Sequence, residues 1–401
     1  MATTKIILKT EKAKTNGEIP IYLRIIKDRK AKFISLGISI DPKYWNDKDK
    51  VVRKSHSNSV YLNNYLAKKI SDAQSVSLEM ETNSKYVTPK KIKQAITGKT
   101  TEQFIPYAER YYENIEKKGR IGSHHRAKAV VSKLKEFVGK SDFTFDDLNV
   151  YFLKKYEDYL RDELKNATNT IHTDMKVIRR IINEAINDDI FPIEKNPFLK
   201  YKLKWTNTEK AFLTENELKA LADLPLNPGS MKYHHRNIYV FAAYSGGMRI
   251  SDICKLRWEN FDGERILLST TKTGSVVSIK LPNKALEIIE LYRQPDQQTS
   301  HFIFPFLDNE VDYSEPKVLY RAISGITAYT NKDLKALATD AGISKNLHFH
   351  TSRHTWATRA LRKGMRIEYV SKLMGHASIK TTQVYAKIVN EELDKAMDVF
   401  N

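Results

Sequence analysis

Cysteine is almost absent from this sequence, with Cys254 alone among 401 residues. A single cysteine excludes an intrachain disulfide and leaves no cysteine pair for a zinc site. Because Cys254 follows Ile253 in an apolar stretch, we expect it to be a small core residue. The sequence therefore gives no sign of an oxidising, secreted environment.

Long hydrophobic runs are also missing. A membrane-spanning helix needs about 18 apolar residues in succession, and no stretch of the sequence approaches that length. Residues 1–15 contain lysines but no apolar segment of the kind found in secretory signals. We therefore expect a soluble cytoplasmic protein with no membrane partner.

Proline and glycine are few, at 12 and 15 residues, and hydrophobic residues make up 41% of the chain. This composition argues against long disordered tracts and favours globular domains. Since 401 residues exceed what one ordinary hydrophobic core holds, the length predicts two or three domains.

Acidic residues are outnumbered by basic ones, 48 to 67, which gives a formal net charge of +19. The excess runs along the whole chain rather than in one tail. Each phosphate that Lys or Arg neutralises releases condensed counterions, so this charge favours a polyanionic partner such as nucleic acid. Charge alone leaves open a generic basic protein of another kind.

The N-terminal region has the pattern of a small basic sheet. Three segments have strand character: Lys5–Thr10, Ile19–Lys27 and Lys32–Ile40. Turn residues separate them, which predicts a meander. Helical spacing follows at 58–78 and at 88–98. Residues 1–95 are thus predicted to form one domain.

Residues 102–194 are predicted to form a helical bundle. Four amphipathic patterns occupy this region: Phe104–Lys118, Ser123–Val138, Asp146–Leu164 and Thr168–Asp189. Their many lysines and arginines are compatible with a solvated face and with a surface for nucleic acid. Residues 195–210 are predicted to be a basic linker, whose lysines would suit a DNA backbone. Thr214 with Glu217 forms a capping box, which predicts that a last domain, 211–401, begins with a helix.

Two segments of the last domain carry candidate phosphate-binding cations. Gly246 and Gly247 are expected to break one helix and Ser251 to cap the next, so that Arg249 is held at a bend. An arginine beside a helix N-terminus is well placed to bind phosphate. The second segment is a predicted β-hairpin with Lys272 at its tip. A lysine in a turn is by itself more often only solvated.

Three further segments contain histidines, an arginine and a tyrosine. His350 and Arg353 lie three residues apart and share one helix face. His350 and His354 have the spacing of a zinc helix, but no accompanying Glu or third ligand is evident, so we expect no metal site. A glycine is expected to end a helix just before His376. Tyr385 follows nine residues later, as one tyrosine among 21.

Together these residues resemble the catalytic set of the tyrosine recombinases, the integrase type of site-specific DNA recombinase. The set is Arg249, Lys272, His350, Arg353, His376 and Tyr385. The strings HTSRHTWAT and LMGHASIKTTQVY are the most specific parts of the resemblance, which covers residues 211–401. One departure is Ser-Gly-Gly-Met before Arg249, where the family more often has Thr-Gly-Leu.

The resemblance implies a multidomain and mainly helical fold. The N-terminal three-stranded sheet resembles the arm-binding domain of lambda-type and conjugative-transposon integrases, and the helical bundle resembles the core-binding domain. Residues 211–401 would be an α+β catalytic domain of the tyrosine recombinase type.

The resemblance also implies the chemistry. Tyr385 would attack the scissile phosphate to give a 3′-phosphotyrosyl enzyme and a free 5′-hydroxyl, without ATP. Arg249 and Arg353 would clamp the phosphate oxygens in the transition state. Lys272 would donate the proton that the leaving 5′ oxygen needs.

The two histidines of the set would assist these steps. His350 would help proton transfer from or to Tyr385, and His376 would hydrogen-bond a phosphate oxygen. Asp252 would brace the arginines rather than react. Since arginine and lysine supply the positive charge, we expect no cofactor and no metal ion.

The expected partner is double-stranded DNA, at core-type and arm-type sites, in the integration or excision of a mobile genetic element. The protein is expected to be a monomer when free and a homotetramer on DNA, with accessory DNA-bending or directionality proteins as compatible partners. An apolar stripe of Leu393, Met397 and Phe400 is expected to dock on a neighbouring protomer. The alternative is that this stripe packs on its own domain.

Two other functions remain open at this point. A type IB topoisomerase forms the same covalent bond but relaxes DNA without exchanging strands. A catalytically inactive DNA-binding regulator would keep the fold and lack the reaction.

Overall fold

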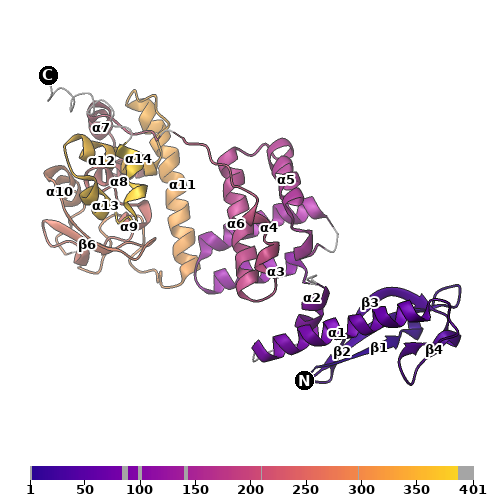
Figure 1. The fold of residues 1–401 in the computed structure, drawn as a ribbon. Coiled ribbons are helices and arrows are strands. Elements are labelled where there is room, and N and C mark those ends of the chain that lie inside the picture. Colours follow the sequence, from indigo (N-terminus) through magenta and orange to yellow (C-terminus); the bar gives the residue numbers. More distant parts are fainter. Residues whose placement is uncertain are drawn as a thin grey trace, which may run out of the picture. The chain divides into compact units, whose positions relative to one another are not determined.

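The computed structural model describes residues 2–83, 89–97, 102–139, 143–208, 210–296 and 298–386 (Figure 1). The chain divides into two compact units, one of residues 1–114 and 125–205 and the other of residues 115–124 and 206–401. The predicted fold class is confirmed, because the structure is mainly helical with a three-stranded sheet near the N-terminus. Among the described residues, no helix combines the length and the apolar character that a membrane span requires.

The N-terminal sheet is an antiparallel meander, as predicted. Its strands are β1 (Thr3–Leu8), β2 (Ile19–Lys27) and β3 (Lys30–Ile40), in the order β1-β2-β3. The β2–β3 turn consists of Asp28 and Arg29, whose φ angles of 49° and 61° are typical of a type I′ hairpin turn. On β2 every second side chain is buried from Ile19 to Ile25, so one face of the sheet is apolar.

Two helices pack on this sheet, α1 (Ser59–Asn83) and α2 (Pro89–Thr97). Leu66 of α1 lies in the same buried cluster as Leu23, and Ile92 of α2 is buried against Ile25. A short ribbon of two strands precedes α1: β4 (Trp45–Asn46) and β5 (Val51–Val52). The N-terminal part of the chain therefore has a hydrophobic core of its own.

A helical bundle with a second hydrophobic core follows. Its helices are α3 (Phe104–Lys117), α4 (Ile121–Val138), α5 (Val150–Asp158) and α6 (Thr168–Asn187). The helix predicted over Asp146–Leu164 begins later than predicted, at Val150. The Asn149 side chain accepts a hydrogen bond from the backbone N–H of Phe152 and thereby starts α5 only at Val150. Beyond α5 the backbone widens into a π-helical turn, Tyr159–Glu163.

The segment after the bundle has little regular structure, but its first part is not a free linker. Tyr201 is buried in the bundle core and its hydroxyl donates to Glu157 at 2.5 Å. The Nζ of Lys204 lies 3.0 Å from the same carboxylate. Burial alone would raise the pKa of Glu157, but hydrogen bonds from Tyr201, Arg161 and Lys204 lower this pKa to about 2. The segment up to Lys204 is thus fastened to the bundle.

The second unit is built around α8 (Met231–Tyr244), whose residues from His235 to Ala243 are all buried. Four other helices pack against α8: α7 (Glu215–Ala222), α10 (Asn283–Glu290), α11 (Pro316–Asp340) and α12 (Phe349–Arg362). The predicted capping box of Thr214 and Glu217 starts α7. Cys254 is completely buried, which confirms it as a core residue.

Short elements of the second unit carry most of the candidate chemistry. They are α9 (Ile250–Ile253), β6 (Arg265–Ser269), β7 (Val276–Lys280), α13 (Ile367–Leu373) and α14 (Gln383–Ala386). The two strands form the predicted hairpin, with Lys272 in the turn between them. Contacts of α13 with β7, and of α13 and α14 with α12, bring these elements together.

Candidate active site

A sharp bend between α8 and α9 positions Arg249. Gly246 and Gly247 have φ angles of 71° and 62°, so both occupy the left-handed region that side chains disfavour. The expectation that Ser251 caps the next helix was wrong, because α9 already begins at Ile250. Arg249 itself is the N-cap residue, in extended conformation, and its carbonyl accepts hydrogen bonds from the first turn of α9.

Arg249 has an unused hydrogen-bond donor. Its Nη1 is buried and has no hydrogen-bond partner in the described part of the chain. The nearest acidic atom is Oδ2 of Asp252, at 3.9 Å. A buried donor without a partner costs about 1–3 kcal/mol, so this nitrogen is suited to an incoming anion. The other carboxylate oxygen of Asp252 accepts a hydrogen bond from the backbone N–H of Thr271, at 2.9 Å.

Arg353 is the most enclosed of the candidate residues, with only 3% of its surface exposed. Its Nη1 donates to the carbonyl of Gly247 and its Nη2 to the carbonyl of Met374, each at 2.6 Å. Burial, together with the positive charge of Arg249, lowers the pKa of Arg353 to about 10, so the guanidinium stays charged at neutral pH. One side chain therefore links the bend before α9 to the end of α13.

His350 and His354 lie one turn apart on α12. Their rings meet edge to face, with centroids 4.8 Å apart. His350 keeps part of its side chain exposed, whereas His354 is buried. Removal from bulk water, followed by the positive charge of Arg353, lowers the pKa of His350 to about 4. The imidazole of His350 is therefore neutral at neutral pH.

Tyr385 is buried on α14, with 5% of its surface exposed, and its hydroxyl contacts an imidazole. Nδ1 of His354 lies 3.0 Å from Oη of Tyr385. Burial raises the pKa of Tyr385, and the positive charges of Arg353 and Arg249 oppose that shift. Tyr385 also packs in the same buried cluster as Met374, whose carbonyl accepts a hydrogen bond from Arg353.

His376 follows a glycine that ends α13, as predicted. Gly375 has a φ of 62°, and the backbone N–H groups of Gly375 and His376 donate to the carbonyls of Lys372 and Ser371. This is the Schellman pattern of hydrogen bonds. The Nδ1 of His376 lies 2.9 Å from Oγ1 of Thr382. Burial and the charge of Arg353 lower the pKa of His376 to about 4.

Lys272 is exposed at the tip of the β6–β7 hairpin. The turn that carries it lies beside the end of α13, since Oγ1 of Thr273 is 3.4 Å from the carbonyl oxygen of Gly375. The positive charge of Lys272 also contributes to the lowered pKa of both His350 and His376. The hairpin is fastened beside this group, since Thr271 is held by Asp252. Thr270 and Thr273 also bond to each other, with their hydroxyl oxygens 2.7 Å apart.

The structure thus gathers all six candidate residues in one place. The group contains two guanidinium groups, an ammonium, two neutral imidazoles and a protonated phenol. Among the described residues, no three His, Cys, Asp or Glu side chains are grouped so that they could hold a metal ion. This arrangement can bind an oxyanion, and it offers a nucleophilic oxygen beside that anion.

Family models match the chain in three consecutive segments. Residues 211–392 match the phage integrase family, residues 103–203 the SAM-like domain of phage integrases, and residues 6–93 an arm DNA-binding domain. The chain belongs to the tyrosine recombinases of the phage integrase type. From the N-terminus, the matches follow the order arm DNA-binding domain, SAM-like domain and phage integrase family.

Characterised relatives of this recombinase have modest sequence identity. Tyrosine recombinase XerC of Pediococcus pentosaceus is 25% identical over 262 residues, which cover 62% of this chain and 79% of the relative. Tyrosine recombinase XerA of Pyrococcus furiosus is 31% identical over 194 residues, which cover 47% and 61%. Both names agree with site-specific recombination as the function.

Two solved structures show that the fold is shared. A lambda integrase dimer bound to a COC′ core site has a TM-score of 0.51 and 16% identity, covering 93% of both chains. The Tn1549 transposon integrase in complex with a circular intermediate DNA has a TM-score of 0.51 and 20% identity, covering 72% of this chain and 95% of that chain.

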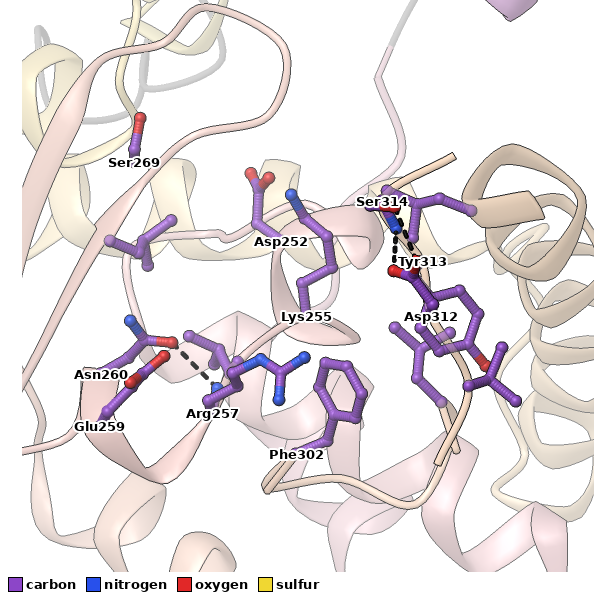
Figure 2. A pocket seen from close by; sticks show the side chains of 15 residues that line it. Asp252, Lys255, Arg257, Glu259, Asn260, Ser269, Phe302, Asp312, Tyr313 and Ser314 are labelled. Atoms are coloured by element: carbon purple, nitrogen blue, oxygen red, sulfur yellow. Dashed lines mark hydrogen bonds between the residues drawn. The ribbon is translucent and has the colours of Figure 1, made fainter. Parts of the chain in front are cut away.

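A cavity of about 470 Å³ lies in the same unit of the recombinase, and Figure 2 shows the side chains around it. Asp252, Lys255 and Arg257 line it, together with Ser269 of β6 and Tyr313. None of the six candidate residues is part of its lining. Asp252, which lies 3.9 Å from Arg249, also lines this cavity and so connects the cavity with the candidate site.

Sequence reasoning missed two contacts of the recombinase site. It considered His354 only as a zinc ligand beside His350, and it did not consider Thr382. His354 and Tyr385 are 31 residues apart in the chain, and no local pattern connects them. The contact arises because α14 packs on α12.

Proposed function

We propose that this recombinase cuts and rejoins double-stranded DNA at specific sites through a covalent bond between Tyr385 and a 3′ phosphate. The observation that carries the proposal is the position of the Tyr385 hydroxyl. Tyr385 packs in one buried cluster with Met374, and Arg353 donates both to the carbonyl of Met374 and to the bend before Arg249, whose Nη1 is buried and has no partner in the described part of the chain. A phosphodiester placed there would meet its nucleophile and its charge neutralisation together.

The cleavage step follows from this placement. Oη of Tyr385 forms a bond to phosphorus while the bond from phosphorus to the 5′ oxygen breaks. Arg249 and Arg353 neutralise the non-bridging oxygens, whose charge grows in the transition state. Lys272 gives a proton to the leaving 5′ oxygen, which becomes a free hydroxyl. The reverse reaction rejoins the strand, and no ATP is used because the covalent bond conserves the energy of the phosphodiester.

The two histidines of the set act around the phosphate. If Thr382 donates its hydroxyl hydrogen to Nδ1 of His376, the ring proton lies on Nε2 and can be donated to a phosphate oxygen. His350, which lies on α12 and keeps part of its side chain exposed, assists proton transfer from or to Tyr385. Both imidazoles are neutral, so each can either donate or accept a hydrogen bond.

The rest of the chain supplies DNA binding. Residues 1–95 would form the arm-binding domain, residues 102–194 the core-binding domain, 195–210 a basic linker and 211–401 the catalytic domain. Each chain has one Tyr385, so exchange of four strands calls for four protomers on two duplexes. Free protein would be monomeric, because the net charge of +19 on each chain opposes self-association until DNA neutralises it.

Docking between protomers would use the C-terminal tail. The stripe of Leu393, Met397 and Phe400 that the sequence suggests for this contact lies outside the described residues. The biological role would be the integration or excision of a mobile genetic element, in which accessory DNA-bending or directionality proteins could take part. The likeness to phage and transposon integrases supports that role.

A suicide substrate tests the proposal. A nick just downstream of the scissile phosphate lets the cut fragment diffuse away, so a covalent adduct accumulates. The parental protein should form an adduct that maps to Tyr385, and Tyr385→Phe should form none while it still binds DNA. Recombinant products from two sites then separate a recombinase from a topoisomerase, which would only relax DNA. An adduct on another residue, or none from the parental protein, would contradict the proposal.

A further inference from the structure

The hydroxyl of Tyr385 has a nitrogen in hydrogen-bond contact that the proposed mechanism has not yet used. Nδ1 of His354 lies 3.0 Å from Oη of Tyr385, and both side chains are buried, with 7% and 5% of their surface exposed. A general base must lie about 2.6–3.2 Å from the atom whose proton it takes. His354 meets that requirement before any DNA is bound.

His350 is connected to the hydroxyl of Tyr385 through His354. It lies on the exposed side of α12, and its ring contacts the ring of His354 edge to face. The two imidazoles therefore form a short series that starts at Tyr385 and ends at the exposed face. In this series the group next to the nucleophile is His354.

We propose that His354 is a catalytic residue that accepts the proton of Tyr385 as this tyrosine attacks the scissile phosphate. The inference rests on the proposed function and adds a residue to it. The O–H bond of Tyr385 breaks, its proton moves to Nδ1 of His354, and the electron pair of that bond forms the new bond to phosphorus. The bond to the 5′ oxygen breaks, and Lys272 protonates that oxygen. During rejoining each transfer runs in reverse.

In the tautomer that carries its ring hydrogen on Nε2, His354 is neutral and its Nδ1 can accept a proton from Tyr385. Burial first, and then the neighbouring His350, Lys210, His348 and Arg353, lower the pKa of His354 to about 3. The ring is therefore neutral in the free protein. A bound phosphodiester would place negative charge near these cations and would thereby raise the pKa of His354. The phenol of Tyr385 gives up its proton only as its oxygen bonds to phosphorus. A neutral imidazole in contact with the hydroxyl is therefore a sufficient base.

Two substitutions remove the basic nitrogen of His354 in different ways. His354→Asn places an amide group close to the position of Nδ1, so a polar partner for Tyr385 remains but a base does not. His354→Gln extends further, toward the position of Nε2. Both variants keep a polar group at this buried position. Using two variants keeps the test valid if one of them does not fold. Each must bind a half-site duplex with parental affinity before its cleavage rate is compared.

Two substrates show which proton transfer is affected. One is the suicide substrate with the ordinary 5′ oxygen, and the other has sulfur in place of that bridging oxygen. A thiolate leaves without a proton, so the sulfur substrate should restore cleavage by Lys272→Ala. We expect His354→Asn to cleave both substrates about 10²-fold or more slowly, because its missing transfer is at Tyr385. Restoration of His354→Asn by the sulfur substrate would place its action at the leaving group and overturn the proposal.

A more acidic phenol at position 385 shows whether His354 accepts the proton of the hydroxyl or only positions it. Replacing Tyr385 by a fluorinated tyrosine lowers the need for a base, so the rate deficit of His354→Asn should shrink by about tenfold or more relative to the parental protein. An unchanged deficit would mean that His354 only positions the hydroxyl. A parental rate from either folded variant would also reject the role. These results are distinct from failure of the proposed function, in which the parental protein itself forms no adduct at Tyr385.

Discussion

The guanidinium of Arg353 donates a hydrogen bond to the carbonyl of Gly247 at 2.6 Å, so the arginine proposed to bind phosphate also closes the bend that positions Arg249. The two residues are also close together at the position that a side chain of Gly247 would occupy. A Cβ added to Gly247 would lie 3.1 Å from both Cα and Cγ of Arg353. The two residues therefore depend on each other for their positions.

Substitution Gly247→Ala should damage both stability and cleavage. The φ of 62° costs an alanine about 1–2 kcal/mol, and the crowding against the backbone of Arg353 adds to that. Thermal unfolding and adduct formation measure the two effects. Gly342→Ala is the matched control, since Gly342 has a φ of 67° and open space around it. If both variants lose equal stability and both keep full cleavage, Gly247 has no special role in the site.

Cleavage should continue in excess EDTA. Charge neutralisation at the phosphate is assigned to Arg249, Arg353 and Lys272, which a chelator does not affect. Adduct formation on the suicide substrate should stay within about twofold of the rate without chelator. A nuclease that depends on divalent ions, run in the same buffer, verifies that chelation is complete. Loss of adduct on chelation, restored by a divalent ion, would show that the cations of the chain are insufficient.

Glu157 should make the stability of the protein depend on pH. Its pKa is lower in the folded chain, about 2, than its ordinary value of 4.5. The carboxylate therefore stabilises the fold fully above that ordinary value and loses this effect as the pH falls toward 2. Glu157→Gln should lower the free energy of unfolding at pH 7 by about 2 kcal/mol.

The difference between Glu157→Gln and the parental protein should narrow as the pH falls from 5 to about 3, which chemical denaturation can follow. Asp158→Asn is the control, because Asp158 is exposed and lies 3.8 Å from Arg161. Its effect should stay below about 1 kcal/mol. A difference for Glu157→Gln that is independent of pH would mean that the carboxylate charge is not what fastens Tyr201 and Lys204.

Deletion of residues 1–95 should remove binding to distant DNA sites and spare cleavage of a short core site. The region has its own hydrophobic core beneath a basic sheet, so the remaining chain should fold without it. A sheet of this kind can enter a major groove and contact base edges. Footprinting on a long attachment site measures the first effect and a suicide substrate the second. Identical footprints before and after deletion would refute an arm-binding role.

Local sequence patterns predicted the elements whose causes are local. The capping box at Thr214, the β2–β3 turn and the glycine end of α13 each depend on residues within a few positions of one another. Ser251 shows the limit of this reasoning. It has the chemistry of a cap, but the extended conformation of Arg249 starts the helix one residue before it. The local sequence is compatible with a cap at Ser251 or at Arg249, and the packing of the bend determines which of them starts the helix.

The contacts inside the site could not be predicted from sequence. The six candidate residues were named from their resemblance to a family, and the pattern alone said nothing about which atoms meet. The carbonyls that Arg353 holds come from the ends of two different helices. The partner of Tyr385 comes from the middle of a third helix. Such contacts depend on how helices pack, and the hydrophobic periodicity of each helix does not specify them.

Asp252 is shared by two parts of the reaction. One of its oxygens faces Arg249, and the other holds the backbone N–H of Thr271 in the turn that carries Lys272. The phosphate binding proposed for Arg249 and the proton donation proposed for Lys272 would therefore be mechanically coupled through a single carboxylate. Losses from substitutions at Arg249 and Lys272 should therefore be non-additive in the parental protein and close to additive in a protein that already lacks this carboxylate, because their coupling is lost with it. In the proposed mechanism, Asp252 would make the phosphate-binding arginine and the acid respond to DNA as one cooperative unit.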